Sequence, residues 1–392
     1  MLAYAAFVAL GMPDGLLGIA WPTMRVDFGV PIDALGLLLV GSVSGYMTSS
    51  FLSGALVARL GVGRLLAISC ALTGAALLGY TLVPVWGMVI ALGVVAGLGA
   101  GAIDAGLNTY AAAHFAEGLV QWLHASYGIG ITMGPIIMTT TLVAFGTWRV
   151  GYRVVSAFQL LMALAFVLTL SWWSAHQGAA DPAGGEPEKT LTDYKTPISE
   201  TIRRPRVWLS VSLFFFYVGA EVSLGTWAYS LLTESRGVAP NLAGFWTSGY
   251  WAMFTIGRIL AGLYARRLGV DLLVQGGLAL ALLGALLLWW NPSPVANLGA
   301  VALVGLAIAP IFPALISGTA RRVGAHLAAN TIGMQMAVTG LGGSLIPSLM
   351  GILARRYTLE IVPVVLTLLF AALIGLYRLA ITVRARRENG IA

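Results

Sequence analysis

The chain has 392 residues, of which 58% are hydrophobic and 9% are charged. A soluble globular chain carries roughly a quarter of charged residues, so the composition excludes a soluble enzyme. The chain has one cysteine, Cys70, which excludes an intrachain disulfide. The net charge of +7 comes from basic residues between hydrophobic runs, which indicates a membrane surface rather than nucleic acid as the neighbour.

The hydrophobic runs repeat along the whole chain. A helix needs about 20 apolar residues to cross a bilayer. Taken in chain order, the twelve predicted spans lie at 2–24, 33–57, 65–83, 86–110, 119–145, 152–175, 207–233, 242–264, 270–290, 296–320, 327–354 and 358–382. We therefore predict an all-α membrane protein with twelve transmembrane helices.

One polar segment divides these spans. Residues 176–206 hold glycines, prolines and charged residues, a mixture that buries too little apolar surface to fold alone. We predict an N-terminal six-helix half at 1–175, a cytoplasmic linker at 176–206 and a C-terminal six-helix half at 207–392. Most loop arginines and lysines fall on the side of the two termini, which predicts that both termini are cytoplasmic.

Ionisable residues inside spans carry the functional prediction, because each costs roughly 2.5–3.5 kcal/mol to insert and therefore usually faces a cavity or a partner. Asp104 and Asn108 lie four residues apart in the fourth span, on one helix face with Gly97 and Gly101. The glycines allow another backbone to approach, and a carboxyl with an amide suits a hydroxyl-rich solute. A structural hydrogen bond between helices is the alternative.

Asp14 follows Pro13 near the middle of the first span, where the proline bends the helix. We predict that Asp14 handles a proton or the solute, the alternative being a carboxyl that satisfies backbone groups freed by the bend. In the seventh span, Glu221 lies one turn after Tyr217, an acidic and aromatic face that suits a sugar. Glu221 could instead be a partner for a neighbouring helix.

Other polar and aromatic residues of the spans are weaker candidates. His124 lies near the start of the fifth span, where it is either a proton carrier or a packing residue. Arg258 lies towards the cytoplasmic end of the eighth span, where we favour a structural role. Further candidate solute contacts are Trp227, Tyr250, Asn330 and Gln335.

Two loops have similar sequences at equivalent places in the two halves. Arg59 and Arg64 follow the second span, and Arg266 and Arg267 follow the eighth, each pair next to a turn glycine. This pattern resembles the loop signature of the major facilitator superfamily and predicts a gating or structural role. A positive-inside anchor with a tight turn is the alternative.

The glycine-rich fourth span with Asp104 and Asn108 resembles the fucose–glucose–hexose branch of the same superfamily, the L-fucose permease-like symporters. Asp14 and the segments 217–221 and 305–313 support this resemblance. In that branch an acid in the first span and another in the fourth handle proton and sugar, and an amide one turn later contacts the sugar. The resemblance implies these roles for Asp14, Asp104 and Asn108; here the fourth-span acid is aspartate instead of glutamate.

The sequence thus predicts a secondary transporter in the plasma membrane, a bacterial inner membrane, that moves a monosaccharide or polyol by proton-coupled alternating access. The acids Asp14, Asp104 and Glu221 are the predicted proton-coupling residues. A proton-coupled exporter of amphipathic compounds is the alternative, and sodium coupling is equally open because carboxylates bind both ions. We expect no cofactor and no resident metal, no enzymatic activity, and a monomer whose partners are the solute, the coupling ion and the bilayer.

Overall fold

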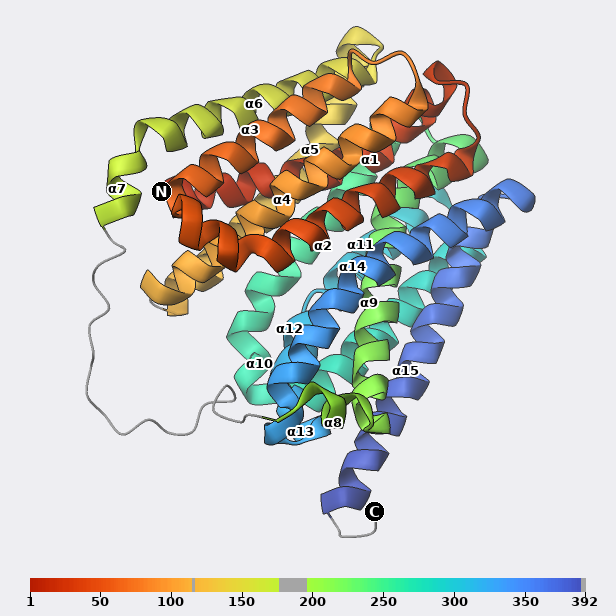
Figure 1. Cartoon of the computed structure of the whole chain (residues 1–392). Coiled ribbons are helices and arrows are strands. Elements are labelled where there is room, and N and C mark those ends of the chain that lie inside the picture. The colour runs from red at the N-terminus through yellow and green to blue at the C-terminus, as the bar shows by residue number, and fades with distance from the viewer. Residues whose placement is uncertain (115–116, 176–195, 389–392) are drawn as a thin grey trace.

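The computed structural model describes residues 1–114, 117–175 and 196–388, and every regular element within these ranges is a helix (Figure 1). The helices in the first part of the chain are α1 (Leu2–Asp27), η1 (Ile32–Ala34), α2 (Leu35–Leu60), α3 (Val62–Tyr80), α4 (Trp86–His114), α5 (Glu117–Phe145), α6 (Trp148–Leu168) and α7 (Leu170–Ala175). Those in the second part are α8 (Ile198–Ile202), α9 (Pro205–Ser230), η3 (Leu231–Ser235), α10 (Pro240–Trp290), α11 (Pro294–Ile308), α12 (Ile311–Ser317), α13 (Thr319–Val323), α14 (Ala325–Arg356) and α15 (Ile361–Glu388).

The all-α membrane class is confirmed. Among the described residues, 11 helices are long and apolar enough to cross a membrane. The remaining predicted span, 242–264, lies in the first part of α10, which is helical but rich in Gly, Ser, Thr, Trp and Tyr and holds Arg258. The eighth and ninth predicted spans run together as α10, with a break at Gly269, whose positive φ of 74° suits a residue without a side chain.

Local sequence explains several helix ends. Prolines occupy the first turn of α9, α10 and α11, where the missing N–H removes no helical hydrogen bond. The side chains of Thr147 and Ser293 cap α6 and α11 by accepting a hydrogen bond from a backbone N–H of the first turn. The bend predicted at Pro13 does not interrupt α1, which continues as one helix through Pro13 and Pro22.

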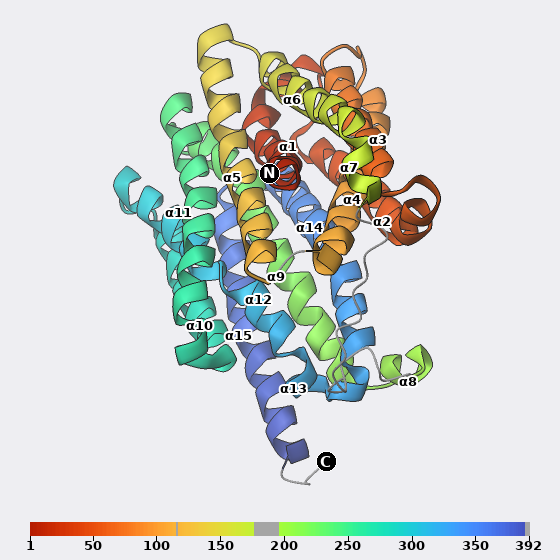
Figure 2. The ribbon, with the colours of Figure 1, turned by 90° about the vertical axis from the view of Figure 1, so that its left-hand side faces the viewer.

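The spanning helices form two groups that lie against each other (Figures 1 and 2). Helices α1–α6 pack mainly on one another and are called the N-terminal bundle here; α9–α15 do the same and are called the C-terminal bundle. The bundles meet mainly through α1 on α9, α2 on α14 and α5 on α10. The domain boundaries at 175/176 and 206/207 stay a prediction.

At one end of the molecule, two ion pairs join the bundles; we call it the closed end. Arg25 at the end of α1 pairs with Glu234 of η3 at 2.6 Å, and Arg355 at the end of α14 pairs with Asp33 of η1 at 3.2 Å. All four side chains are partly accessible, so each pair alone contributes little to stability, about 0–1 kcal/mol. The bundles diverge from this end towards the opposite one (Figure 1).

Arg236 organises the closed end of the C-terminal bundle. Its guanidinium donates to Glu360 at 2.7 and 3.0 Å, to the Asn297 side chain at 2.7 Å and to the Leu288 carbonyl at 2.7 Å. Only 4% of the Arg236 side chain is exposed, whereas 40% of Glu360 is exposed. The hydrogen bonds from Arg236 are the main reason that the pKa of Glu360 lies below its ordinary value of 4.5.

We expect Glu360→Gln to lower the melting temperature at neutral pH. Because the folded-state pKa is lowered, the carboxylate stabilises the fold above about pH 4.5, and this contribution is lost as the pH falls further. Thermal unfolding of the purified protein from pH 7 to pH 3 should show the variant and wild-type curves converging in acid. Glu200 forms a surface pair with Arg204, and the control Glu200→Gln should therefore show the same dependence of melting temperature on pH as the wild type. A constant difference at all pH values would contradict the charge-based explanation.

Candidate functional site

Asp104 lies on α4 between two hydrogen-bonding partners. The Tyr46 hydroxyl of α2 donates to one carboxylate oxygen, and the Asn108 amide, one turn further along α4, donates to the other at 2.8 Å. All three side chains are partly accessible. The predicted pairing of an acid with an amide on one helix face is therefore present, and a tyrosine from another helix completes it.

Glycines bring α2 and α4 close enough for this contact. A Cβ atom on Gly97 would lie 1.9 Å from the carbonyl oxygen of Ser42, and one on Gly101 would lie 2.3 Å from that of Tyr46. Any larger side chain would force the two backbones apart. The close approach that we predicted for Gly97 and Gly101 thus occurs, and it is what holds Tyr46 within reach of Asp104.

Asp14 has the same arrangement on a second pair of helices. The Tyr127 hydroxyl of α5 donates to the Asp14 carboxylate at 2.7 Å. A Cβ atom on Gly11 would lie 2.4 Å from the Tyr127 carbonyl oxygen, and one on Gly130 would lie 2.1 Å from that of Val8. Each acid is therefore held by a tyrosine from a helix that glycines allow into backbone contact.

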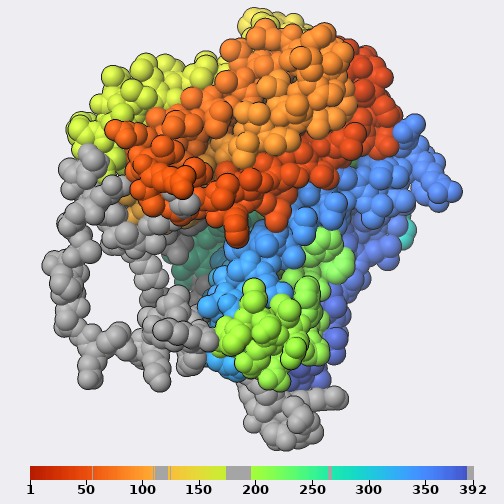
Figure 3. All heavy atoms as spheres, viewed as in Figure 1, coloured from red at the N-terminus to blue at the C-terminus, as the bar shows by residue number. Residues whose placement is uncertain are grey.

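The two acids interact with each other although they lie on different helices of the N-terminal bundle. Asp14 is exposed although it lies within α1, directly beside the buried Gly15 and Leu16. It interacts electrostatically with Asp104 and with Tyr46, which come from other helices of the same bundle. Figure 3 shows a recess between the two bundles on the side away from the closed end.

The C-terminal bundle contributes an acid and a base to this region. Glu221 of α9 interacts electrostatically with Arg258 of α10, and Tyr127 of the other bundle interacts with both. One carboxylate oxygen of Glu221 and the Nε of Arg258 are buried and have no hydrogen-bond partner among the residues that the structure describes. The Arg258 guanidinium also lies 4.2 Å from the ring centre of Phe254, a cation–π contact. Tyr127 is thus hydrogen-bonded to Asp14 and lies within the electrostatic influence of the Glu221–Arg258 pair.

The predicted aromatic contacts are packed rather than open. The Tyr217 hydroxyl donates to the Ile308 carbonyl at 2.9 Å, and that of Tyr250 donates to the Glu221 carbonyl at 2.8 Å. Trp227 donates from its ring N–H to the Pro347 carbonyl at 3.0 Å and lies against Gly351. These three side chains are fully buried. In this conformation Tyr217 and Tyr250 support Glu221 and its helix, and Trp227 joins α9 to α14.

The predicted residues of α14 lie elsewhere. Asn330 donates to the Thr196 carbonyl at 2.9 Å and to the Thr201 hydroxyl at 3.0 Å, which fixes α8. Gln335 is buried and bonded to Ser210 at 2.9 Å and to Thr319 at 3.2 Å. The structure does not bring either side chain together with the acids. Their amides could not be placed from the sequence because their partners come from α8, α9 and α13.

Arg59 and Arg64 are exposed at the ends of α2 and α3, and Arg267 is exposed two residues before the break at Gly269 in α10. The side chains of His124 and Arg266 lie outside the described part of the structure. Tyr46 and Tyr127 were missed as functional residues. The sequence feature that could have identified them is a tyrosine next to a glycine in a span with small residues, as in Gly45-Tyr46 and Tyr127-Gly128.

Two helical bundles around an interior that holds acids, with the helix ends of one side joined, define a membrane transport protein. The chain belongs to the Major Facilitator Superfamily, whose sequence pattern it matches over residues 3–347.

Relatives and solved structures agree with this assignment. The chain is 21% identical to the glucose/mannose transporter GlcP of Bacillus subtilis, with 99% of this chain and 95% of that protein aligned. It is 25% identical to the sodium-dependent glucose transporter 1A of Mus musculus, over 98% of this chain and 97% of that protein. Its fold is similar to that of the nucleoside transporter NupG, with a TM-score of 0.74, 14% identity and coverage of 97% and 98%. It is also similar to a bacterial homologue of the human lysosomal transporter Spinster in an inward-facing, occupied conformation, with a TM-score of 0.75, 13% identity and coverage of 97% and 96%.

Proposed function

We propose that this chain is a symporter that takes up a monosaccharide or a similar polyol together with protons. The observation that carries the proposal is the pair of acid–tyrosine contacts, Asp14–Tyr127 and Asp104–Tyr46, whose two acids interact electrostatically within the N-terminal bundle. Carboxylates, hydroxyls and the Asn108 amide supply the paired donors and acceptors that sugar hydroxyls require. Relatives along the full length are named as glucose transporters, which supports a sugar as the solute.

Proton coupling is proposed to act through the charge of the two acids. Asp14 and Asp104 interact electrostatically, so a proton on either one removes one of two like charges that repel each other. The loaded carrier then reorients with less uncompensated charge in its interior. Some relatives are named as sodium-dependent, which makes sodium the competing coupling ion for the same carboxylates.

Alternating access is proposed to arise from rocking of one bundle against the other. If both termini are cytoplasmic, the end closed by Arg25–Glu234 and Asp33–Arg355 is the outer end, and the structure corresponds to an inward-facing state. We propose that the solute then reaches Asp14 and Asp104 from the cytoplasm. Opening the closed end requires these two ion pairs to separate.

The test is uptake by the purified protein in proteoliposomes. Radiolabelled glucose, mannose, fucose and mannitol are supplied outside under an inward proton gradient, an inward sodium gradient or neither. We expect at least one of these solutes to accumulate under the proton gradient and to equilibrate without it. Accumulation only under the sodium gradient would overturn proton coupling. Extrusion of amphipathic dyes by proton exchange, with no sugar movement, would overturn the sugar symporter.

A further inference from the structure

A short segment at the start of the C-terminal bundle has no role in the proposed transport cycle. It comprises residues 197–208, which include α8, the following turn and the first turn of α9, at the opposite end of α9 from η3 (Figure 1). Asn330 of α14 donates hydrogen bonds to Thr196 and Thr201, and Thr196 donates to the His326 carbonyl at 2.7 Å. Thr201 is fully buried. The segment is therefore fixed on the bundle, with one face buried and the other exposed.

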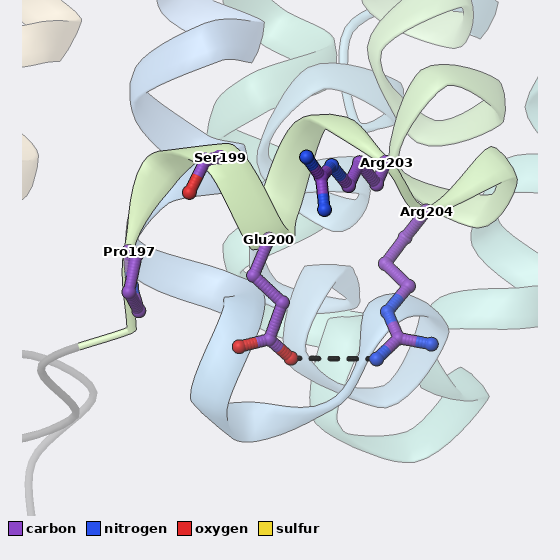
Figure 4. A pocket seen from close by; sticks show the side chains of 5 residues that line it. All are labelled: Pro197, Ser199, Glu200, Arg203 and Arg204. Atoms are coloured by element: carbon purple, nitrogen blue, oxygen red, sulfur yellow. Dashed lines mark hydrogen bonds and ion pairs between the residues drawn. The ribbon is translucent and has the colours of Figure 1, made fainter.

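The exposed face is basic. Pro197, Ser199, Glu200, Arg203 and Arg204 surround a pocket of about 340 Å³, drawn in Figure 4. Arg204 contacts Glu200 at 3.4 Å, with 51% and 43% of the two side chains exposed. Arg203 is exposed and has no ion-pair partner among the described residues. With two arginines and one glutamate, the pocket has a net positive charge.

Large apolar side chains lie beside these arginines. Ile198 and Ile202 are 62% and 44% exposed and lie four residues apart, on one face of α8. Trp208 is 50% exposed, and its ring N–H donates to the Ile202 carbonyl at 2.7 Å. Trp208 is in the first turn of α9, a candidate membrane span. Basic residues combined with exposed apolar and tryptophan side chains at the start of a span are typical of the boundary between headgroups and acyl chains.

We propose that residues 197–208 bind an anionic phospholipid, whose phosphate contacts Arg203 and Arg204 and whose acyl chains lie against Ile198, Ile202 and Trp208. Charge complementarity explains the preference for an anionic headgroup. The exposed apolar side chains explain why the ligand is a lipid and not a free phosphate. The hydroxyl of Ser199, which lines the same pocket, is a further donor to the headgroup.

The experiment measures lipid binding to the detergent-purified full chain by its thermal stabilisation. The probes are short-chain phosphatidylglycerol, short-chain phosphatidylcholine and inorganic phosphate. We expect saturable stabilisation by phosphatidylglycerol alone. The double variant R203Q/R204Q should need about 25-fold more phosphatidylglycerol for half-maximal stabilisation, since each arginine near an anionic surface contributes roughly 5-fold to the affinity.

The matched control is R59Q/R64Q, which removes the same charge from two exposed arginines of the N-terminal bundle. It should leave phosphatidylglycerol binding as in the wild type. Equal stabilisation by phosphatidylcholine, equal stabilisation by inorganic phosphate, or an unchanged half-maximal concentration in R203Q/R204Q would each overturn the proposal. Ile198→Ser should weaken phosphatidylglycerol binding while leaving the basal melting temperature unchanged, because the side chain is exposed. The assay involves no transport, so failure of the sugar-symport proposal does not affect it.

Discussion

Proteoliposomes that contain the Asp104→Asn variant are expected to equilibrate the solute but not to accumulate it under a proton gradient. A symporter that moves one proton per solute sustains about 10-fold accumulation per pH unit. Asparagine keeps the shape of the side chain and can still contact Tyr46 and Asn108, but it cannot bind and release a proton. The accumulation ratio should therefore fall to about 1, while exchange of labelled for unlabelled solute continues.

Three companion variants sharpen this test. Asp14→Asn should show the same loss, because its carboxylate interacts electrostatically with that of Asp104 and is the second proposed proton-coupling acid. Tyr127→Phe removes the hydrogen bond to Asp14 and should slow uptake about 10-fold without abolishing accumulation. The control Asp27→Asn alters an acid at the end of α1 that pairs with Arg149 of the same bundle, and it should accumulate solute normally. Full accumulation by Asp104→Asn would exclude Asp104 as the coupling residue.

The Gly18→Leu variant is expected to fold but to lose at least about 99% of transport, which is about 2.7 kcal/mol in rate terms. A Cβ atom on Gly18 would lie 2.7 Å from the Gly225 carbonyl oxygen and 2.9 Å from that of Thr226, across the contact between α1 and α9. These are backbone atoms, so no change of rotamer relieves the clash. The bundles then cannot meet at the closed end, and a cycle that requires this end to close stops.

Cysteine labelling checks the cause of the transport loss. The only native cysteine, Cys70, is buried, and Ser348 of α14 lies against Gly36 of α2 between the bundles. With Ser348→Cys as the reporter, a maleimide should react at least about 10-fold faster in the Gly18→Leu background. With Gly18 present, closure of the contact between α2 and α14 excludes the reagent from this position. The control is Gly54→Leu, since no atom of the described residues lies within 4 Å of a Cβ atom at Gly54. Normal transport by Gly18→Leu, or unchanged labelling, would contradict closure through this contact.

Hydrophobic runs were sufficient to predict the helices, because a bilayer imposes one length and one polarity on every span. The helical segments agree with the predicted spans to within several residues at most ends. The break at Gly269 falls between two predicted spans, where a glycine followed by charged and apolar residues permits a turn. The predicted closeness of the fourth span to another helix followed from Gly97 and Gly101 alone.

The candidate site could be predicted only in part. Asp104 and Asn108 meet because they are four residues apart on one helix, a relation that the sequence contains. Tyr46 and Tyr127 reach their acids from α2 and α5, and the packing of helices distant in the chain decides such contacts. Asn330 and Gln335, like Asn108, are amide residues within a span. Their hydrogen-bond partners, however, lie in and next to α8 for Asn330 and at the buried Ser210 for Gln335. Residue type alone does not separate these cases.

The glycine contacts of α2 with α4 also determine which substitutions the site can tolerate. Gly97 and Gly101 touch no solute, yet a single methyl group at either position would move Tyr46 away from Asp104. The contact between Asp104 and Tyr46 therefore depends on the absence of a side chain at Gly97 and Gly101. In a survey of inactivating mutations, the sensitive positions of α4 should accordingly form a stripe along one helix face. Within that stripe the glycines should be as intolerant of change as the aspartate.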